Sequence, residues 1–121
     1  MKNDAVYLHH ILDSINHIQG YIAGVSYDQF LRNSLLQDGV VRQLEIVGEA
    51  AKSVSGTFRD AHPELPWSQM TGIRNKLIHG YFEVDPFIVW DTVQSDLPPL
   101  KQQVERILEA LGGEHGESEK Q

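Results

Sequence analysis

The residues best suited to chemistry stand in one short run, Arg74-Asn75-Lys76-Leu77-Ile78-His79-Gly80-Tyr81. Apolar side chains at helical spacing predict a helix over about residues 67–79, with Gly80 as its stop signal. At ~100° per residue, Asn75 and His79 would then lie one turn apart on the same face. Arg74 is offset by about one position, but its long side chain could reach the edge of that face. The run therefore predicts a polar cluster at a helix end.

These residue types suit attack on a phosphodiester. Histidine titrates near neutrality and can take or give a proton. Arginine holds a planar set of donors against phosphate and stabilises charge that grows in the transition state. Asparagine can orient the histidine or bind a phosphate oxygen. RNA supplies its own nucleophile, the 2′-hydroxyl, so this chemistry needs no metal or other cofactor, and DNA would be a poor substrate.

Spacing alone leaves a structural alternative open. Arg74 could pair with a carboxylate such as Glu49, while His79 caps the helix C-terminus, where a cation is favoured. For Glu49 itself we favour a salt bridge that orients Arg74 over a role in proton transfer.

The rest of the sequence predicts an all-α domain. Helical spacing, N-cap residues and glycine or proline breaks define segments at about residues 4–22, 26–31, 34–54, 67–79 and 85–111, with one further turn around Phe58. The last segment should bend at Pro98-Pro99 and end at Gly112-Gly113. No alternating strand pattern competes. We expect an antiparallel bundle of four to six helices over residues 1–111, followed by a polar, mobile tail over 112–121.

Composition limits the class of protein. The chain has 121 residues, enough for about one domain, and no cysteine, which excludes disulfides and thiolate metal sites. We expect no signal peptide, because the first residues lead straight into an amphipathic pattern, and the sequence has no apolar run of membrane-spanning length. We therefore expect a cytoplasmic protein that does not engage a membrane. A small core without such cross-links often gains stability by oligomerising, which makes a homodimer the default expectation.

The charge is negative overall but unevenly distributed. The formal net charge of −7 opposes nonspecific nucleic-acid binding. Residues 32–76, however, hold six basic and five acidic side chains, whereas the rest of the chain holds four basic and twelve acidic ones. An anionic ligand should therefore meet the middle of the chain, and the acidic surround could suit a basic protein partner.

The run around Arg74 resembles the signature of HEPN-domain proteins, an Arg-Asn pair followed by three residues and a histidine. Three further blocks, in the same order, resemble the HepT-like toxin subfamily. They are Glu45-Ile46-Val47-Gly48-Glu49-Ala50-Ala51, His62-Pro63-Glu64-Leu65-Pro66-Trp67, and Val84-Asp85 through Trp90 to Leu97-Pro98. The resemblance spans nearly the whole chain, from Asp4 to about Leu111.

That resemblance implies a HEPN-like helical dimer in which two copies of the motif form a metal-independent endoribonuclease site. It implies that Arg74 stabilises the transition state, that His79 is a general acid or base, and that Asn75 supports them. It also implies a partner, a minimal nucleotidyltransferase antitoxin, with which a larger assembly could form. In the subfamily, the tyrosine two residues after the histidine receives AMP from the antitoxin, and Tyr81 stands at that position.

An AMP group on Tyr81 would place an anionic phosphate beside Arg74 and His79 and occupy the site that RNA needs. In isolation, however, Tyr81 could equally be an aromatic side chain that packs at the helix end.

Other polar and aromatic residues have ordinary explanations. His9, Asp13 and His17 recur at every fourth position, but they lie beside an apolar stripe, so we expect a solvated face and no metal site. Lys52 and Arg59 could guide an RNA backbone or be ordinary surface cations. Two tryptophans, Trp67 and Trp90, occupy apolar positions and are expected in the core.

Three functions remain open at this point. The leading hypothesis is an endoribonuclease toxin controlled by a nucleotidyltransferase. The second is a non-catalytic nucleotide- or partner-binding module that assists a nucleotidyltransferase, which the acidic surface favours. The third is a purely structural helical dimer in which Arg74 and His79 bridge the subunits.

Overall fold

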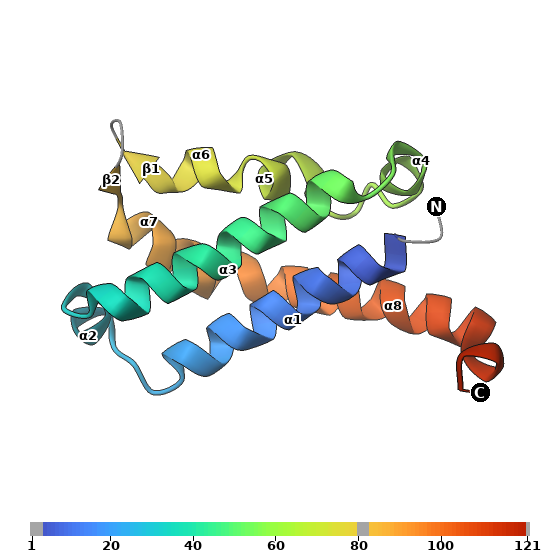
Figure 1. The fold of residues 1–121 in the computed structure, drawn as a ribbon, viewed down its shortest axis with the longest axis horizontal. Coiled ribbons are helices and arrows are strands. Elements are labelled where there is room, and N and C mark those ends of the chain that lie inside the picture. Colours follow the sequence, from blue (N-terminus) through green and yellow to red (C-terminus); the bar gives the residue numbers. More distant parts are fainter. Residues whose placement is uncertain (1–3, 80–82, 121) are drawn as a thin grey trace.

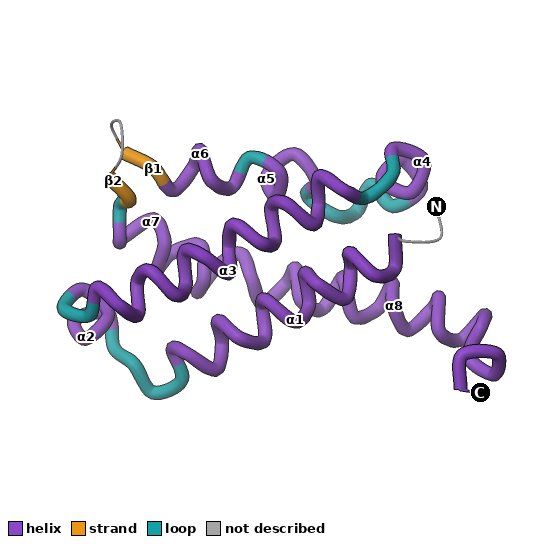
Figure 2. The backbone as a smooth tube through the Cα atoms, in the orientation of Figure 1, coloured by secondary structure: helices purple, strands orange, loops and turns teal. Residues whose placement is uncertain are grey.

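The computed structural model describes residues 4–79 and 83–120, with side chains described for 4–77 and 84–112. Figures 1 and 2 show a bundle built almost entirely from helices. Its elements follow in the order α1 (Asp4–Ile22), α2 (Tyr27–Leu31), α3 (Ser34–Ser53), α4 (Gly56–Ala61), α5 (Trp67–Thr71), α6 (Ile73–Leu77), β1 (Ile78–His79), β2 (Glu83–Val84), α7 (Pro86–Asp91), a π-helical segment (Thr92–Asp96) and α8 (Leu97–Lys120).

The two long helices α1 and α3 form the centre of the bundle. They lie side by side, with α8 packed against α1 and with α5 and α6 packed along α3 (Figure 1). Their facing side chains recur at helical spacing and are fully buried: Leu8, Ile11, Ile15, Ile18, Val40, Leu44, Val47 and Ala51. Burial of this apolar stripe supplies the main stabilisation of the fold.

Local caps fix where the shorter elements begin. Ser26 caps α2 in a capping box with Gln29, and Asn33 caps α3. Ser55 caps α4 through its hydroxyl group. The carboxylate of Asp4, at the start of α1, accepts hydrogen bonds from the backbone N–H and the hydroxyl of Ser55, both at 2.8 Å. Asp4 thus ties the start of α1 to the start of α4.

The helix expected over residues 67–79 is shorter and divided. Gly72 separates α5 from α6, and α6 ends at Leu77. Ile78 and His79 instead pair with Val84 and Glu83 as an antiparallel hairpin. The prediction that the helix continues to His79 is therefore wrong. The Leu77 carbonyl accepts a hydrogen bond from the Asp85 N–H at 2.9 Å, so the hairpin satisfies a group that a helix end would leave open.

The C-terminal helical stretch is continuous from Pro86 to Lys120. Asp85 caps its start by accepting hydrogen bonds from the backbone N–H groups of Phe87 and Ile88. The π-helical turn lies just before Pro98-Pro99, where the missing N–H groups and the proline rings disrupt the regular helical ladder. Because α8 runs to Lys120, the prediction that the helix ends at Gly112-Gly113 is wrong. The division into a domain and a mobile tail stays a prediction.

The predicted all-α bundle is confirmed. If α5 and α6 are counted as one helix, and the continuous stretch from α7 to α8 as another, the described chain contains six helices, within the expected range of four to six. Within residues 4–79 and 83–120, no helix combines the length and the apolar character needed to cross a bilayer.

Candidate functional site

The motif helix α6 lies unusually close to α3, because Gly48 stands at the contact. A Cβ atom at this position would lie 3.0 Å from Ile73 Cγ2 and 3.1 Å from the carbonyl oxygen of Met70. Both distances are shorter than ordinary van der Waals contact. Gly48 therefore sets the separation between α3 and the segment that contains α5 and α6.

Arg74 points from α6 toward a carboxylate on α3. Its Nε lies 3.7 Å from Glu45 Oε2, while Arg42 Nη1 lies 3.8 Å from the other carboxylate oxygen of Glu45. The Arg74 side chain is 72% exposed. Among the described residues, Glu45 is the ion-pair partner of Arg74. The ion pair draws the guanidinium toward α3, while its large exposure leaves donors accessible to an anionic ligand.

The predicted partner of Arg74 was the wrong glutamate. The ion pair is made by Glu45, one helical turn before Glu49, and the described residues show none between Glu49 and Arg74. Sequence reasoning missed Glu45, although its four-residue spacing from Glu49 places both on one face of α3. Both carboxylates line a hollow of about 310 Å³ that opens beside the motif. The full lining is Glu45, Gly48, Glu49, Lys52, Thr71, Ile73 and Arg74.

The next two motif residues are also on the surface. Asn75 is exposed on α6, next to Arg74. Lys76 Nζ donates to Asp96 Oδ2 at 2.8 Å, which links α6 to the π-helical segment. Lys76 thus has a positional role, whereas the amide of Asn75 is available to a ligand.

The remaining predicted site residues fall at or beyond the hairpin. His79 is the second residue of β1, paired with Glu83, so the one-turn helical relation to Asn75 does not apply. His79 lies two residues after the end of α6 and five residues after Arg74. Tyr81, the predicted AMP acceptor, lies outside the described residues.

The remaining residues singled out from the sequence lie in the core, in surface hollows or on α1. Trp67 and Trp90 are half-buried and pack against the hydrophobic core, as predicted. Lys52 lines the hollow beside Arg74, and Arg59 lines a neighbouring one. In the part of the chain that the structure describes, no three His, Asp or Glu side chains are placed to hold a metal ion, and this includes His9, Asp13 and His17.

Comparisons with known proteins point in one direction. The family model described as "Ribonuclease HepT-like" matches residues 11–107. A protein of Thermococcus cleftensis named "Probable ribonuclease HepT" is 41% identical over 84% of this chain and 92% of its own length. A protein of Caldanaerobacter subterraneus named "Putative RNase TTE0752" is 39% identical over 90% of this chain and 97% of its own. No solved structure gives a significant match. The chain therefore belongs to the ribonuclease HepT-like family, which confirms the family and the endoribonuclease class expected from its sequence.

Proposed function

We propose that this chain is a cytoplasmic, metal-independent endoribonuclease toxin that acts as a homodimer and is neutralised by a nucleotidyltransferase antitoxin. The observation that carries the proposal is the exposed guanidinium of Arg74, which forms an ion pair with Glu45 and is followed along the chain by Asn75 and His79. Relatives named as ribonucleases support the same reaction class.

The proposed reaction uses the nucleophile that RNA carries. The 2′-oxygen attacks the adjacent phosphorus, the bond from phosphorus to the 5′-oxygen breaks, and a 2′,3′-cyclic phosphate and a 5′-hydroxyl form. A base takes the proton of the 2′-hydroxyl, and an acid protonates the leaving 5′-oxygen. His79 fits either proton-transfer role. Arg74 would stabilise the negative charge on the phosphoryl oxygens, and Asn75 would hold one of those oxygens.

A dimer would complete a site that is open in one subunit. Arg74 and Asn75 are exposed, so a single chain leaves them in water, where electrostatic stabilisation is weak. A second motif facing the first would exclude water from the phosphate. It would also supply a second His79, so that one histidine could act as base and the other as acid. Sedimentation velocity of the wild-type chain would test the dimer, and a monomer that cleaves RNA at full rate would contradict it.

The cleavage proposal is tested by Arg74→Ala and His79→Ala in RNA-cleavage and growth-inhibition assays. Each substitution should abolish cleavage and toxicity while the far-ultraviolet circular dichroism spectrum stays helical. Arg32→Ala, an exposed arginine near the start of α3, is the matched control and should cleave like the wild type. Full toxicity of the double variant would refute the proposal.

Neutralisation is proposed to occur by transfer of AMP to Tyr81. Tyr81 lies two residues beyond His79, so the added phosphate would compete with RNA for the positive charge of Arg74. The test is the intact mass of the chain before and after incubation with a minimal nucleotidyltransferase and ATP. A gain of one or more AMP units, lost in Tyr81→Phe, is expected. An unchanged mass with an active partner would contradict this part of the proposal.

Two observations favour the alternative of a non-catalytic binding module. The hollow beside Arg74 contains two carboxylates, Glu45 and Glu49, and the chain has a net charge of −7, which weakens RNA binding. In that case the purified dimer would bind nucleotides tightly without cutting any RNA. Cleavage that co-purifies with the wild-type chain and is lost in Arg74→Ala would exclude this alternative.

A further inference from the structure

We propose that the hollow between α4 and α5 is a second RNA subsite, which binds a ribonucleotide that flanks the cleaved phosphate. The inference rests on the proposed ribonuclease function, and it assigns a positioning role to Arg59. The hollow measures about 1030 Å³, larger than the one beside Arg74. Its lining residues are Gly56, Arg59, Asp60, Pro63, Leu65, Pro66, Trp67, Ser68, Gln69 and Thr71.

The two hollows are neighbours. Thr71, the last residue of α5, lines both of them, and Arg74 follows three residues later on α6. An extended RNA strand whose scissile phosphate lies at Arg74 could therefore continue past Thr71 into the larger hollow. Lys52, on the wall of the first hollow, adds positive charge along the same path.

Arg59 supplies the strongest sign that the larger hollow receives a ligand. Its Nε atom is buried and has no hydrogen-bond partner among the described residues. Buried donors are nearly always paired in folded proteins, so this unpaired Nε marks an Arg59 side chain that no described residue anchors, and the part of the side chain that lines the hollow can meet an acceptor from a bound molecule. The guanidinium group matches the geometry of a phosphate, and Arg59 forms no ion pair with a described carboxylate. The nearby carboxylate of Asp60 limits the affinity.

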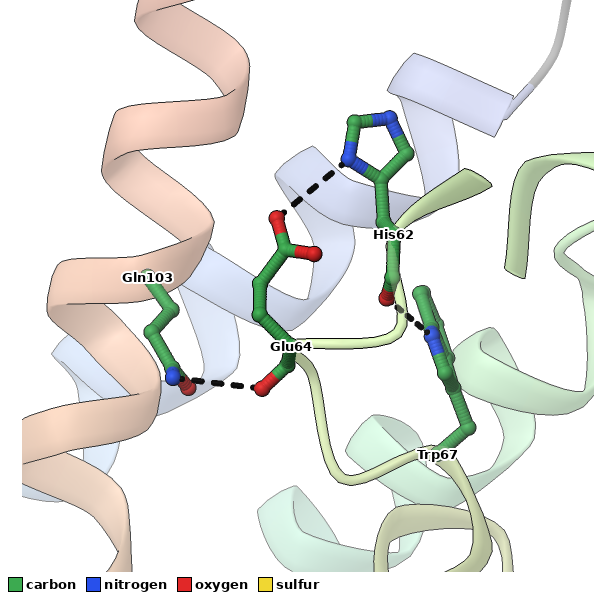
Figure 3. Close-up of polar contacts among 4 residues, drawn as sticks. All are labelled: His62, Glu64, Trp67 and Gln103. Carbon is green, nitrogen blue, oxygen red and sulfur yellow. Dashed lines mark hydrogen bonds and ion pairs between the residues drawn. The ribbon is translucent and has the colours of Figure 1, made fainter. Parts of the chain in front are cut away.

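The segment from His62 to Trp67, which forms part of the wall of this hollow, is held in place by hydrogen bonds. Trp67 Nε1 donates to the carbonyl of His62 at 2.8 Å, and Gln103 Nε2 of α8 donates to the carbonyl of Glu64 at 3.2 Å (Figure 3). The His62 ring lies 3.4 Å from the Glu64 carboxylate in the same view. Two prolines further restrict this segment. Since the wall is fixed before binding, little conformational entropy would be lost when a ligand enters.

The lining residues of the larger hollow suit both the phosphate and the base of a nucleotide. Arg59 faces the anionic part, while the exposed side chains of Ser68 and Gln69 offer donors and acceptors for a base edge. Pro63, Pro66 and Trp67 supply apolar surface against which a base plane can pack. A single-stranded RNA segment combines these chemical features.

The test uses a short single-stranded RNA that the wild-type chain cleaves, together with its 2′-O-methyl form, which cannot react. Arg59→Gln keeps most of the side-chain volume and removes the charge. It should weaken binding of the 2′-O-methyl RNA about tenfold and lower the slope of log K against log salt by about 0.7, the value of one phosphate contact. It should raise KM by a similar factor and leave kcat within about twofold, because Arg59 does not touch the reacting atoms.

Two further variants keep the test decisive. Gln69→Ala removes an exposed side chain and should also raise KM, whereas Arg32→Gln, at the end of α2 and before the start of α3, should change neither constant. If the wild type cleaves RNA and both subsite variants match it in Kd and KM, the subsite is refuted and the ribonuclease stands. If the wild type binds RNA without cleaving it and Arg59→Gln weakens binding, the subsite stands and the ribonuclease is refuted.

Discussion

The contact at Gly48 allows a quantitative test of how the bundle positions Arg74. In Gly48→Ala, the new methyl group would meet Ile73 Cγ2 at 3.0 Å and the Met70 carbonyl oxygen at 3.1 Å. The carbonyl belongs to the backbone, and isoleucine is restricted at χ1, so neither neighbour can simply rotate away. Helices α5 and α6 must then shift outward by a few tenths of an ångström, and Arg74 moves with them.

Two opposing effects determine how much Gly48→Ala changes the free energy of unfolding. Alanine favours a helix interior over glycine by about 1 kcal/mol, whereas overpacking a tight contact costs about 1–3 kcal/mol. Because one of the two contacts is to backbone, we expect the overpacking cost to exceed the gain in helix propensity, so that Gly48→Ala lowers the free energy of unfolding by about 1 kcal/mol. The matched control is Gly20→Ala on α1, where a Cβ atom would meet nothing within 4 Å. The free energy of unfolding of Gly20→Ala should rise by up to about 1 kcal/mol.

The assay is urea unfolding of both variants, followed by RNA cleavage under the same conditions. We expect Gly48→Ala to unfold at lower urea than Gly20→Ala and to lose on the order of tenfold in kcat, since displaced catalytic groups act less efficiently. A Gly48→Ala variant as stable and as active as Gly20→Ala would show that the α3–α6 spacing does not position the site.

Three further substitutions test separate contacts. Glu45→Gln removes the partner of the motif arginine, and because that pair is largely exposed it should change the unfolding free energy by less than about 1 kcal/mol while kcat falls. Lys76→Glu should lower cleavage by breaking its 2.8 Å contact with Asp96, and the second change Asp96→Lys should restore it, as a double-mutant cycle would measure. Asp4→Ala leaves the Ser55 N–H and hydroxyl without their acceptor and should cost about 1–3 kcal/mol in urea unfolding, with kcat unchanged.

Much of the fold follows from local sequence signals. The predicted bounds of the first helix match α1, and the predicted start of the third segment matches that of α3, because apolar spacing and caps are properties of nearby residues. The end of the last helix was missed because a Gly-Gly pair is only a weak stop signal. Each glycine costs about 1 kcal/mol relative to alanine, which does not prohibit a helix.

The site was predicted less completely because its details depend on contacts between distant segments. The end of the motif helix is set by pairing of Ile78 with Val84, which competes with continuation of the helix to His79. Whether Arg74 pairs with Glu45 or with Glu49 depends on the position of α6 along the axis of α3. Both glutamates share a face of α3, so the sequence identifies the face and only the packing identifies the residue.

The most direct test of the central claim is the chemistry of the RNA ends that the purified chain produces in the presence of EDTA. Mass spectrometry of the products should show 2′,3′-cyclic phosphate and 5′-hydroxyl ends from the wild type. The Arg74→Ala variant should yield no product, and RNA methylated at the 2′-oxygen should stay intact. Products with 3′-hydroxyl and 5′-phosphate ends, or cleavage that stops when EDTA is added, would contradict the proposed attack by the 2′-hydroxyl.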